Sequence, residues 1–468
     1  MDRGLSEEFC GVELGDRRLN RRLVMVAEAL EHKAEESICA AIGDFHACKA
    51  AYRLFANPKL RPEKILEPHI QRSLARAKES SENLLIVHDT TELAYGRFKS
   101  IKDLGVLTTA SGMKQGLRGI GLHNSLLITE SGIPLGIIRQ SFFTKEDYRI
   151  KRGQAEKNLV GVNKKYCLED KASFRWIEHL NSCHAMLSPV GKEVIHVADR
   201  ESDIYEFLQT ADELDAKYVV RSMANRRIKT GTGTKDTSTL DAKLLSTESL
   251  GTTKLEISDE NGRVQLHHML VKAVQVSLFC PQRNVQSQKV GALKPLRVWI
   301  VEIASLEEPG LRWRLLTNLE CADFNDAIRI MNIYRQRWSI ETYHRAIKSG
   351  YGIEEARLGA RARLENLCAL LSILAWRVMW LYLTARHFPQ VHCSALFSPK
   401  EMQILSLSKF CSSKDPQKLL AGEAVTILAR IGGFLARKSD GPPGMTSIWK
   451  GLRILGERIE FIHEMTYG

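Results

Sequence analysis

Two short apolar runs that each end near an aspartate place the strongest constraint on the fold of this chain. Residues 84–87 (LLIV) lead into Asp89, and residues 194–198 (VIHVA) lead into Asp199. Compact apolar runs of this length are typical of buried strands. A short helical stretch follows the second run and precedes another strand candidate at 217–221. Strands that alternate with helices predict a mixed α/β fold, here with carboxylates at the ends of strands.

Helical patterns flank these strands. Residues 5–85 have apolar side chains at helical spacing after a possible N-cap at Gly15-Asp16, and residues 323–385 and the remainder of the chain also read as helical. Residues 225–312 instead alternate in the manner of strands, with Asn261-Gly262 as a hairpin turn. We therefore expect a β-rich insertion between helical parts.

One apolar stretch, Leu367 to Leu383, is long enough to span a membrane. Arg377 lies in its middle and no second span accompanies it, so we interpret it as a buried core helix. The N-terminus lacks a secretory signal pattern. Ten cysteines occur without a single C-x-x-C pair, so the sequence indicates neither a zinc motif nor a redox motif. Scattered cysteines of this kind fit a reduced cytoplasmic compartment best.

The charge of the chain points to a polyanionic partner. Apolar residues (44%) and charged residues (26%) are near globular averages, which excludes wholesale disorder, and the net charge is +12. The excess is concentrated in residues 139–165, 217–235 and 335–363, which carry +5, +6 and +4. Clustering of this kind suggests nucleic acid, although a solvated lysine-rich face is a common alternative.

Four arginines occupy the first turns of the expected N-terminal helix. Basic residues there oppose the helix dipole, so they either lie on a solvated face or contact an anionic partner such as DNA. The residues are Arg17, Arg18, Arg21 and Arg22.

A second cluster of charged residues follows helical spacing. Tyr334, Arg337, Glu341 and Lys348 fall within a stripe of about 60° if one helix carries them at about 100° per residue. A solvated face is the alternative, but Glu341 and Lys348 are two turns apart and are not ordinary i,i+4 partners.

Three distant carboxylates can be combined into one site. An α/β sheet can bring Asp89 and Asp199 together, and Glu341 on a packed helix would complete an all-oxygen set. Three carboxylates repel one another unless a cation neutralises them, and hard oxygen ligands favour Mg²⁺ or Mn²⁺. Two such ions catalyse phosphodiester displacement, and Arg337 and Lys348 would then contact the DNA phosphates.

The same residues resemble a known family. His-Asp89-Thr-Thr, Ala-Asp199-Arg-Glu-Ser-Asp and the spacing Tyr334-(2)-Arg337-(3)-Glu341-(6)-Lys348 are similar to the three signature blocks of bacterial DDE cut-and-paste transposases of the insertion-sequence group with the Y-R-E-K motif. Similarity continues in other segments of the chain. They are Leu14-Gly-Asp-Arg-Arg, Ala51 to Pro58, Val219 to Ser222, and Ala429 to Lys438.

The resemblance implies a fold and its division. We expect an RNase H-like catalytic core with a β-rich insertion, flanked by N-terminal and C-terminal helical regions. The expected parts are a helical DNA-binding region (1–82), the first part of the core (83–224), the insertion (225–312), the second part of the core with the Glu-bearing helix (313–385) and a dimerisation region (386–468).

The resemblance also implies the chemistry and the partners. Asp89, Asp199 and Glu341 would be catalytic and would bind two Mg²⁺ ions, with Mn²⁺ as a substitute. The enzyme would nick the transposon end, form and reopen a hairpin, and join the 3′ end to target DNA. Its partners would be double-stranded DNA and a second copy of the chain in the end-paired complex, with no membrane and no nucleotide cofactor.

Further DNA contacts follow by position in the family. Tyr334, Arg337 and Lys348 would contact the backbone of the transposon end, as would Arg221 and Arg357, and the N-terminal arginines resemble end-recognition residues. Met223 stands where one relative in the family has a basic residue, so the resemblance does not imply a contact at this position. Trp313 and Trp338 match residues that stack on a flipped base, and core packing is the alternative for both.

Two other functions share part of this pattern. An RNase H-like or resolvase-type nuclease would use the carboxylates without a joining step, and a non-catalytic DNA-binding inhibitor would need none of them. The neighbouring acids Glu92, Glu201 and Asp203 require no catalytic role.

Overall fold

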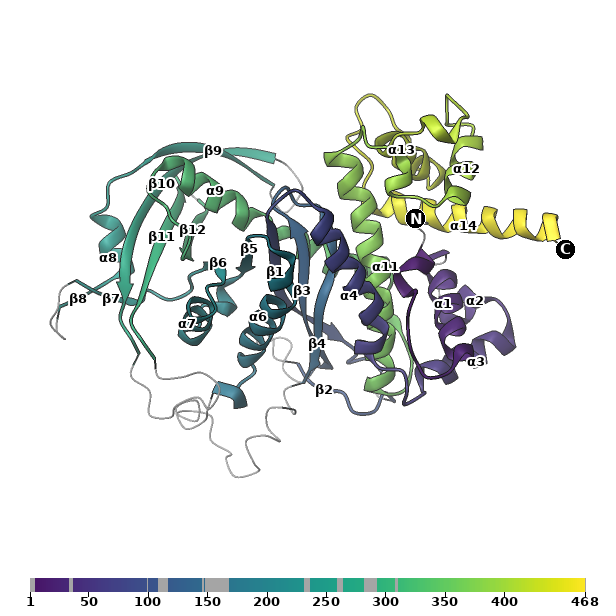
Figure 1. The fold of residues 1–468 in the computed structure, drawn as a ribbon, viewed down its shortest axis with the longest axis horizontal. Coiled ribbons are helices and arrows are strands. Elements are labelled where there is room, and N and C mark those ends of the chain that lie inside the picture. The colour runs from purple at the N-terminus through teal and green to yellow at the C-terminus, as the bar shows by residue number, and fades with distance from the viewer. Residues whose placement is uncertain are drawn as a thin grey trace. The chain divides into compact units, whose positions relative to one another are not determined.

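The computed structural model describes residues 5–32, 37–98, 100–107, 117–144, 147, 168–230, 236–258, 264–281, 293–307 and 310–467. Two compact units make up the chain (Figure 1). The first unit comprises Met1–Ser80, Thr90–Thr144 and Ser339–Gly468, and the second unit comprises Ser81–Asp89 and Lys145–Trp338. Strand β1 (Leu84–Ala94) therefore contributes its residues up to Asp89 to the second unit and the rest to the first.

A mixed sheet forms the second unit. From the first half of β1 its order is β5, β6, β12, β11, β10, β7 and β8, with β9 also paired to β10. The β1–β5 and β5–β6 pairs are parallel and the other pairs are antiparallel, which confirms the predicted mixed α/β class. The strands are β5 (Val194–Ala198), β6 (Lys217–Arg221), β7 (Arg227–Lys229), β8 (Thr237–Thr239), β9 (Gly251–Ser258), β10 (Val264–Leu278), β11 (Leu296–Ser305) and β12 (Arg312–Thr317).

Strands predicted between residues 225 and 312 are present and join this sheet through the β11–β12 pair. The predicted hairpin is confirmed by the antiparallel register of Ser258 with Val264, while its turn, Asn261-Gly262, lies outside the described residues. Most of the basic stretch 139–165 and the end of the stretch 217–235 also lie outside them.

Helices cover both faces of the second unit's sheet. α6 and α7 share a core with Ala198, Tyr218 and Val220 on one face, and α9 packs on β5, β6, β10 and β11. Side chains alternate across a strand, so Asp199 points to the opposite face from Ala198. The helices are α6 (Phe174–Leu187), α7 (Tyr205–Glu213), α8 (Leu240–Leu245) and α9 (Phe324–Arg335), with short 3₁₀ turns η4 (Leu168–Asp170), η5 (Ser188–Val190) and η6 (Arg200–Ser202).

The first unit is mainly helical. Its strands are the second half of β1, β2 (Gly105–Val106), β3 (Arg118–Thr129) and β4 (Pro134–Phe143), and α4 and α11 pack against β4. The helices are α1 (Arg17–His32), α2 (Ile38–Ile42), α3 (Phe45–Phe55), α4 (Pro62–Glu79), α10 (Trp338–Arg345, whose first residue belongs to the second unit), α11 (Arg361–His387), α12 (Pro399–Leu407), α13 (Ala421–Ile431) and α14 (Met445–Tyr467). Short turns are η1 (Leu5–Phe9), the π turn η7 (Ala346–Gly350), η8 (Ile353–Glu355), η9 (Cys393–Ala395) and η10 (Pro416–Lys418).

Helix α11 is the membrane-length stretch of the sequence. Among the described helices it is long and apolar enough to cross a bilayer, but 83% of its apolar window is buried within the protein, which confirms the prediction of a core helix. Arg377 in its middle is buried between two acids: its Nη1 lies 2.8 Å from Glu31 of α1, and its Nη2 lies 2.7 Å from Glu401 of α12. This triad ties α1, α11 and α12 together.

A disulfide joins Cys39 of α2 to Cys48 of α3. The absence of a C-x-x-C pair led us to expect a reduced compartment, and spacing alone gave no sign that these two cysteines would meet. The bond fixes the short α2 against α3 within the first 60 residues.

The buried triad makes the stability of the protein depend on pH. One guanidinium cannot neutralise two buried carboxylates, so desolvation raises the pKa of Glu31 to about 7 despite the attraction of Arg377. Because this folded-state pKa exceeds the unfolded value of 4.5, Glu31 reduces the free energy of unfolding as the pH rises from about 4.5 to 7. Glu31→Gln should flatten this part of the profile, as measured by urea unfolding between pH 5 and 8. A profile identical to that of the wild type would contradict the assignment.

Candidate catalytic site

The two aspartates predicted at strand ends lie side by side in the second unit, but the prediction holds only for Asp199, because β1 continues past Asp89 to Ala94. β1 and β5 pair in parallel with Leu84 opposite Val194 and His88 opposite Ala198, so Asp89 and Asp199 are the next residues in the same register. Neighbouring strands are about 4.8 Å apart, and residues at equivalent positions share a face. The carboxylates of Asp89 and Asp199 therefore emerge on the same face at the end of the paired segment.

A tight turn holds Asp199. Its backbone is extended (φ −80°, ψ −172°), and its Oδ1 caps η6 by accepting a hydrogen bond of 2.8 Å from the Glu201 N–H. Burial raises the pKa of Asp199, opposed by that N–H and by the positive charges of Arg337, Arg200 and Arg175. The carboxylate is thus desolvated and set among cations, as a ligand for a positive charge would be.

Arg337 places a positive charge beside both aspartates. Its Nη1 lies 3.9 Å from Asp89 Oδ2, and its charge stabilises the ionised form of Asp199. The guanidinium also lies 5.9 Å from the ring centroid of Tyr334 and 6.0 Å from that of Trp338. The second unit therefore brings together three of the predicted site residues, Asp89, Asp199 and Arg337. The rings of Tyr334 and Trp338 lie next to Arg337.

The expectation of one straight helix from Tyr334 to Lys348 is wrong. α9 ends at Arg335, where the Gln336 N–H bonds back to Ile333 O and the Arg337 N–H to Tyr334 O, which closes the helix in a tight turn. α10 then starts at Trp338 and carries Glu341, and Lys348 lies in the π turn η7. No single described helix carries all four residues of the motif, and Glu341 and Lys348 belong to the first unit.

The two tryptophans predicted to stack on a base differ in exposure. Trp313 of β12 is 6% exposed and meets the ring of Tyr334 edge to face at 5.2 Å, with Tyr334 itself 1% exposed. Trp338 is 57% exposed. In this state Trp338 offers a ring to solvent, whereas Trp313 and Tyr334 pack in the interior.

The other predicted DNA contacts lie at the surface. Arg221 ends β6 and is half-buried, with its Nη2 3.5 Å from the Arg312 carbonyl. Met223, two residues later, is exposed. Arg357 is exposed in the first unit, with its guanidinium 4.8 Å from the ring centroid of Phe98.

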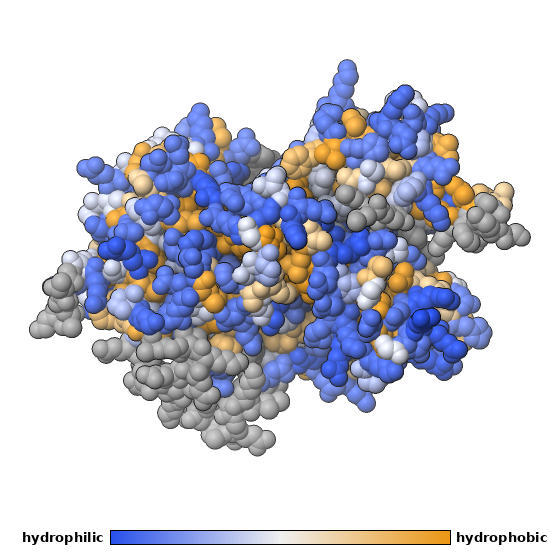
Figure 2. Space-filling model, viewed as in Figure 1, coloured by the Kyte–Doolittle hydropathy of each residue, from blue (hydrophilic) through white to orange (hydrophobic). Residues whose placement is uncertain are grey.

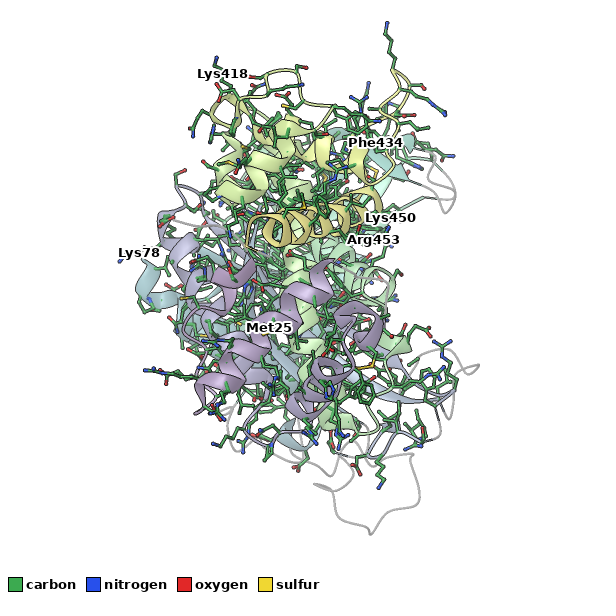
Figure 3. All side chains as sticks on the ribbon, turned by 90° about the vertical axis from the view of Figure 1, so that its right-hand side faces the viewer. Met25, Lys78, Lys418, Phe434, Lys450 and Arg453 are labelled. Atoms are coloured by element: carbon green, nitrogen blue, oxygen red, sulfur yellow. A yellow bond between two sulfur atoms is a disulfide. The ribbon has the colours of Figure 1, made fainter. Side chains whose placement is uncertain are left out.

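The N-terminal arginines line a hollow on α1. Arg17, Arg18, Arg21 and Arg22 surround it together with Met25, and Met25 lies at the surface of the purple N-terminal helices (Figure 3). The Asp16 side chain accepts a hydrogen bond of 2.8 Å from the Arg18 N–H, as the predicted N-cap requires. The face of this helical region in view is mostly hydrophilic (Figure 2).

Sequence reasoning missed the role of a neighbouring acid. The sequence did not indicate that the buried carboxylate of Asp203 pairs with Arg226, 23 residues away. Lys217 pairs with Asp215. The basic stretch 217–235 is therefore partly neutralised by acids. The pairing of Asp203 with Arg226 is a contact between distant positions, so the pattern of the sequence did not reveal it.

The residues in the second unit fit a divalent cation. Asp89 and Asp199 supply hard oxygen donors on one face of the sheet, and a cation would offset the desolvation that raises the pKa of Asp199.

Three family models match successive parts of the chain. A transposase DNA-binding model matches residues 1–60, a transposase DDE domain model matches residues 175–377, and a Transposase Tn5 dimerisation domain model matches residues 373–466. The DDE match implies an RNase H-like core, and it includes Asp199, Arg337 and Glu341.

The unequal burial of the two tryptophans predicts different effects of alanine. Trp313→Ala should lower the free energy of unfolding by about 3–5 kcal/mol, because it leaves a cavity against Tyr334. Trp338→Ala should change it by less than about 0.5 kcal/mol, because the ring is largely exposed. Urea unfolding of the two variants measures the difference, and equal losses would contradict this arrangement.

Proposed function

We propose that this DDE transposase, a metal-dependent enzyme with its own DNA-binding and dimerisation domains, excises an insertion element and joins it to target DNA. The observation that carries the proposal is the placement of Asp89, within β1, and Asp199, just after β5, on one face of the sheet beside Arg337. Among family members, we expect a close relationship to the transposase of the composite transposon that carries kanamycin resistance.

The proposed site adds Glu341 to the two aspartates. Glu341 follows Arg337 by four residues and lies in the first turn of α10. Bound by these three carboxylates, two Mg²⁺ ions, or Mn²⁺ in their place, would activate the attacking oxygen and stabilise the leaving one. Arg337 and Lys348 would hold the phosphates of the transposon end, with Arg221 and Arg357 further along the backbone.

All four proposed steps are displacements at phosphorus, so one set of residues can serve them. Water attacks the phosphodiester at the element's end and releases a 3′ hydroxyl. That hydroxyl attacks the opposite strand and closes a hairpin, and a second water reopens it. The same 3′ hydroxyl finally attacks target DNA, and a target 3′ oxygen leaves.

Hairpin closure requires a sharply bent strand. We propose that Trp338 stacks on a base turned out of the duplex near the end, because its ring is exposed and lies next to Arg337. Tyr334 and Trp313 are buried against each other. Contacts of these two with DNA would require this packing to open on binding.

The end-paired complex is proposed to be a homodimer in which each subunit binds one end and cuts the other. On α14, Ile448, Leu452 and Leu455 are buried, whereas Phe461 and Met465 expose apolar side chains toward its C-terminal end. Lys450 and Arg453 lie on its exposed side (Figure 3). We expect the distal end of α14 to meet a second copy of the chain, and the complex to form on DNA in the bacterial cytoplasm.

Removal of a carboxylate tests the catalytic assignment. Asp89→Ala, Asp199→Ala or Glu341→Ala should keep the affinity for a duplex that carries the element's terminal repeat and should abolish its cleavage in Mg²⁺ or Mn²⁺. Wild-type protein should yield a nick, a hairpin and a joined product on a denaturing gel. Nicks without a hairpin or joined product would favour a nuclease, and unchanged activity of Glu341→Ala would exclude that residue.

Charge on α14 tests the dimer. Phe461→Glu with Met465→Glu should prevent pairing of two ends, seen by native gel electrophoresis, while single-end binding persists. Leu435→Glu is a matched control because Leu435 is similarly exposed (61%) but lies outside α14. End pairing that survives the double substitution would contradict the proposed interface.

A further inference from the structure

A buried aspartate organises the loop between β6 and β7. Asp203 Oδ2 accepts hydrogen bonds from Ser222 Oγ (3.2 Å), the Met223 N–H (2.8 Å) and the Ala224 N–H (3.1 Å). Asp203 Oδ1 accepts from Arg226 Nε (2.8 Å) and Nη2 (2.5 Å). Its side chain has no exposed surface, so its charge is satisfied within this loop.

The same aspartate belongs to the turn that presents Asp199. Ser202 Oγ donates to the Asp199 carbonyl at 2.7 Å, and the Asp203 N–H donates to the Arg200 carbonyl at 3.3 Å. Arg226 Nη2 also donates to the Asp203 carbonyl. The side chains of Asp203 and Arg226 thus connect the turn at residues 199–203 directly to the loop at residues 222–226.

The loop is held from its inner side and exposes its outer side. The N–H groups of Met223 and Ala224 point to Asp203, while both residues are exposed to solvent. Asn225 Oδ1 accepts from the Asp241 N–H at the start of α8 (3.0 Å). Arg221 immediately precedes the loop.

We propose that Asp203 and Arg226 are positioning residues that fix the loop at residues 222–226, and with it Arg221, along the backbone of the bound DNA strand. The proposal rests on the proposed function, because it takes DNA as the ligand of this surface. In this arrangement the guanidinium of Arg226 pairs with the carboxylate of Asp203, so it holds the loop in place and does not bind a phosphate. A bidentate guanidinium suits this role because it bonds the carboxylate and the carbonyl of one residue.

The sign of the effect separates anchoring from simple electrostatics. Asp203→Asn removes a negative charge near the proposed DNA surface, which by Coulomb attraction alone would tighten DNA binding. If Asp203 anchors the loop, Asp203→Asn should instead weaken DNA binding. The asparagine NH₂ group would face either the donors at Oδ2 (Ser222, Met223 and Ala224) or the Arg226 guanidinium at Oδ1, and the N–H groups on either side cannot accept its hydrogens. A charge-preserving change, Arg226→Lys, should also weaken binding, since lysine cannot form the bidentate pair.

The experiment compares Asp203→Asn and Arg226→Lys with Asp215→Asn in the full-length protein. Asp215→Asn changes the net charge equally, and its left-handed backbone (φ 52°) suits asparagine. The probe is a duplex that carries the terminal repeat, with affinity measured at two salt concentrations. We expect about tenfold weaker binding for the first two variants, because each loses a hydrogen bond to a charged group. We expect no weakening for the third.

Hydrogen exchange provides a readout that does not depend on DNA. The amides of Met223 and Ala224 should lose protection in Asp203→Asn, while the melting temperature of Arg226→Lys shows that the fold persists. Unchanged protection, or tighter DNA binding by Asp203→Asn, would overturn the inference. Failure of the wild-type protein to bind the terminal repeat would instead refute the proposed function.

Discussion

The parallel register of β1 with β5 is the constraint on which the site depends. A shift of one residue would send the carboxylates of Asp89 and Asp199 to opposite faces of the sheet. Apolar side chains alone specify this register weakly, because both faces of these strands are buried. A polar contact adds specificity: His88 Nε2 and His196 Nδ1 lie 2.9 Å apart, buried on the face away from the aspartates. A shifted register would separate these ring nitrogens and break their buried hydrogen bond, which would destabilise the shifted pairing.

The turn after β5 shows how two nearby aspartates acquire different chemistry. The carboxylate of Asp203 accepts five hydrogen bonds from side-chain and backbone donors, including Nε and Nη2 of Arg226. Its negative charge is therefore satisfied by groups of the protein itself. Asp199 caps the turn through one N–H, and burial raises its pKa. The first arrangement stabilises a loop, and the second leaves a carboxylate suited to bind a cation.

The sequence allowed prediction of the features that depend on local pattern. Compact apolar runs gave β1 and β5, the N-cap at Asp16 gave the start of α1, and an arginine within an apolar stretch indicated a buried core helix. It failed where tertiary contacts decide. The break between α9 and α10, the burial of Trp313 and the pairing of Asp203 with Arg226 depend on neighbours distant in the chain. A helical wheel assumes a straight helix, so it could not reveal that the charged motif is divided among α9, α10 and a π turn.

That break gives Arg337 a particular role. It lies between the end of α9 and the start of α10, with a side chain that is largely buried between Asp89 and two aromatic rings. Its 3.9 Å separation from Asp89 is a Coulombic contact rather than a hydrogen bond. In the proposed complex a phosphate would share the guanidinium with Asp89, while the faces of Tyr334 and Trp338 continue to hold its plane. If the guanidinium turned to this phosphate, the aspartates would lose part of their neutralising charge. Their affinity for a divalent cation should then rise, so binding of DNA and binding of metal would reinforce each other at this site.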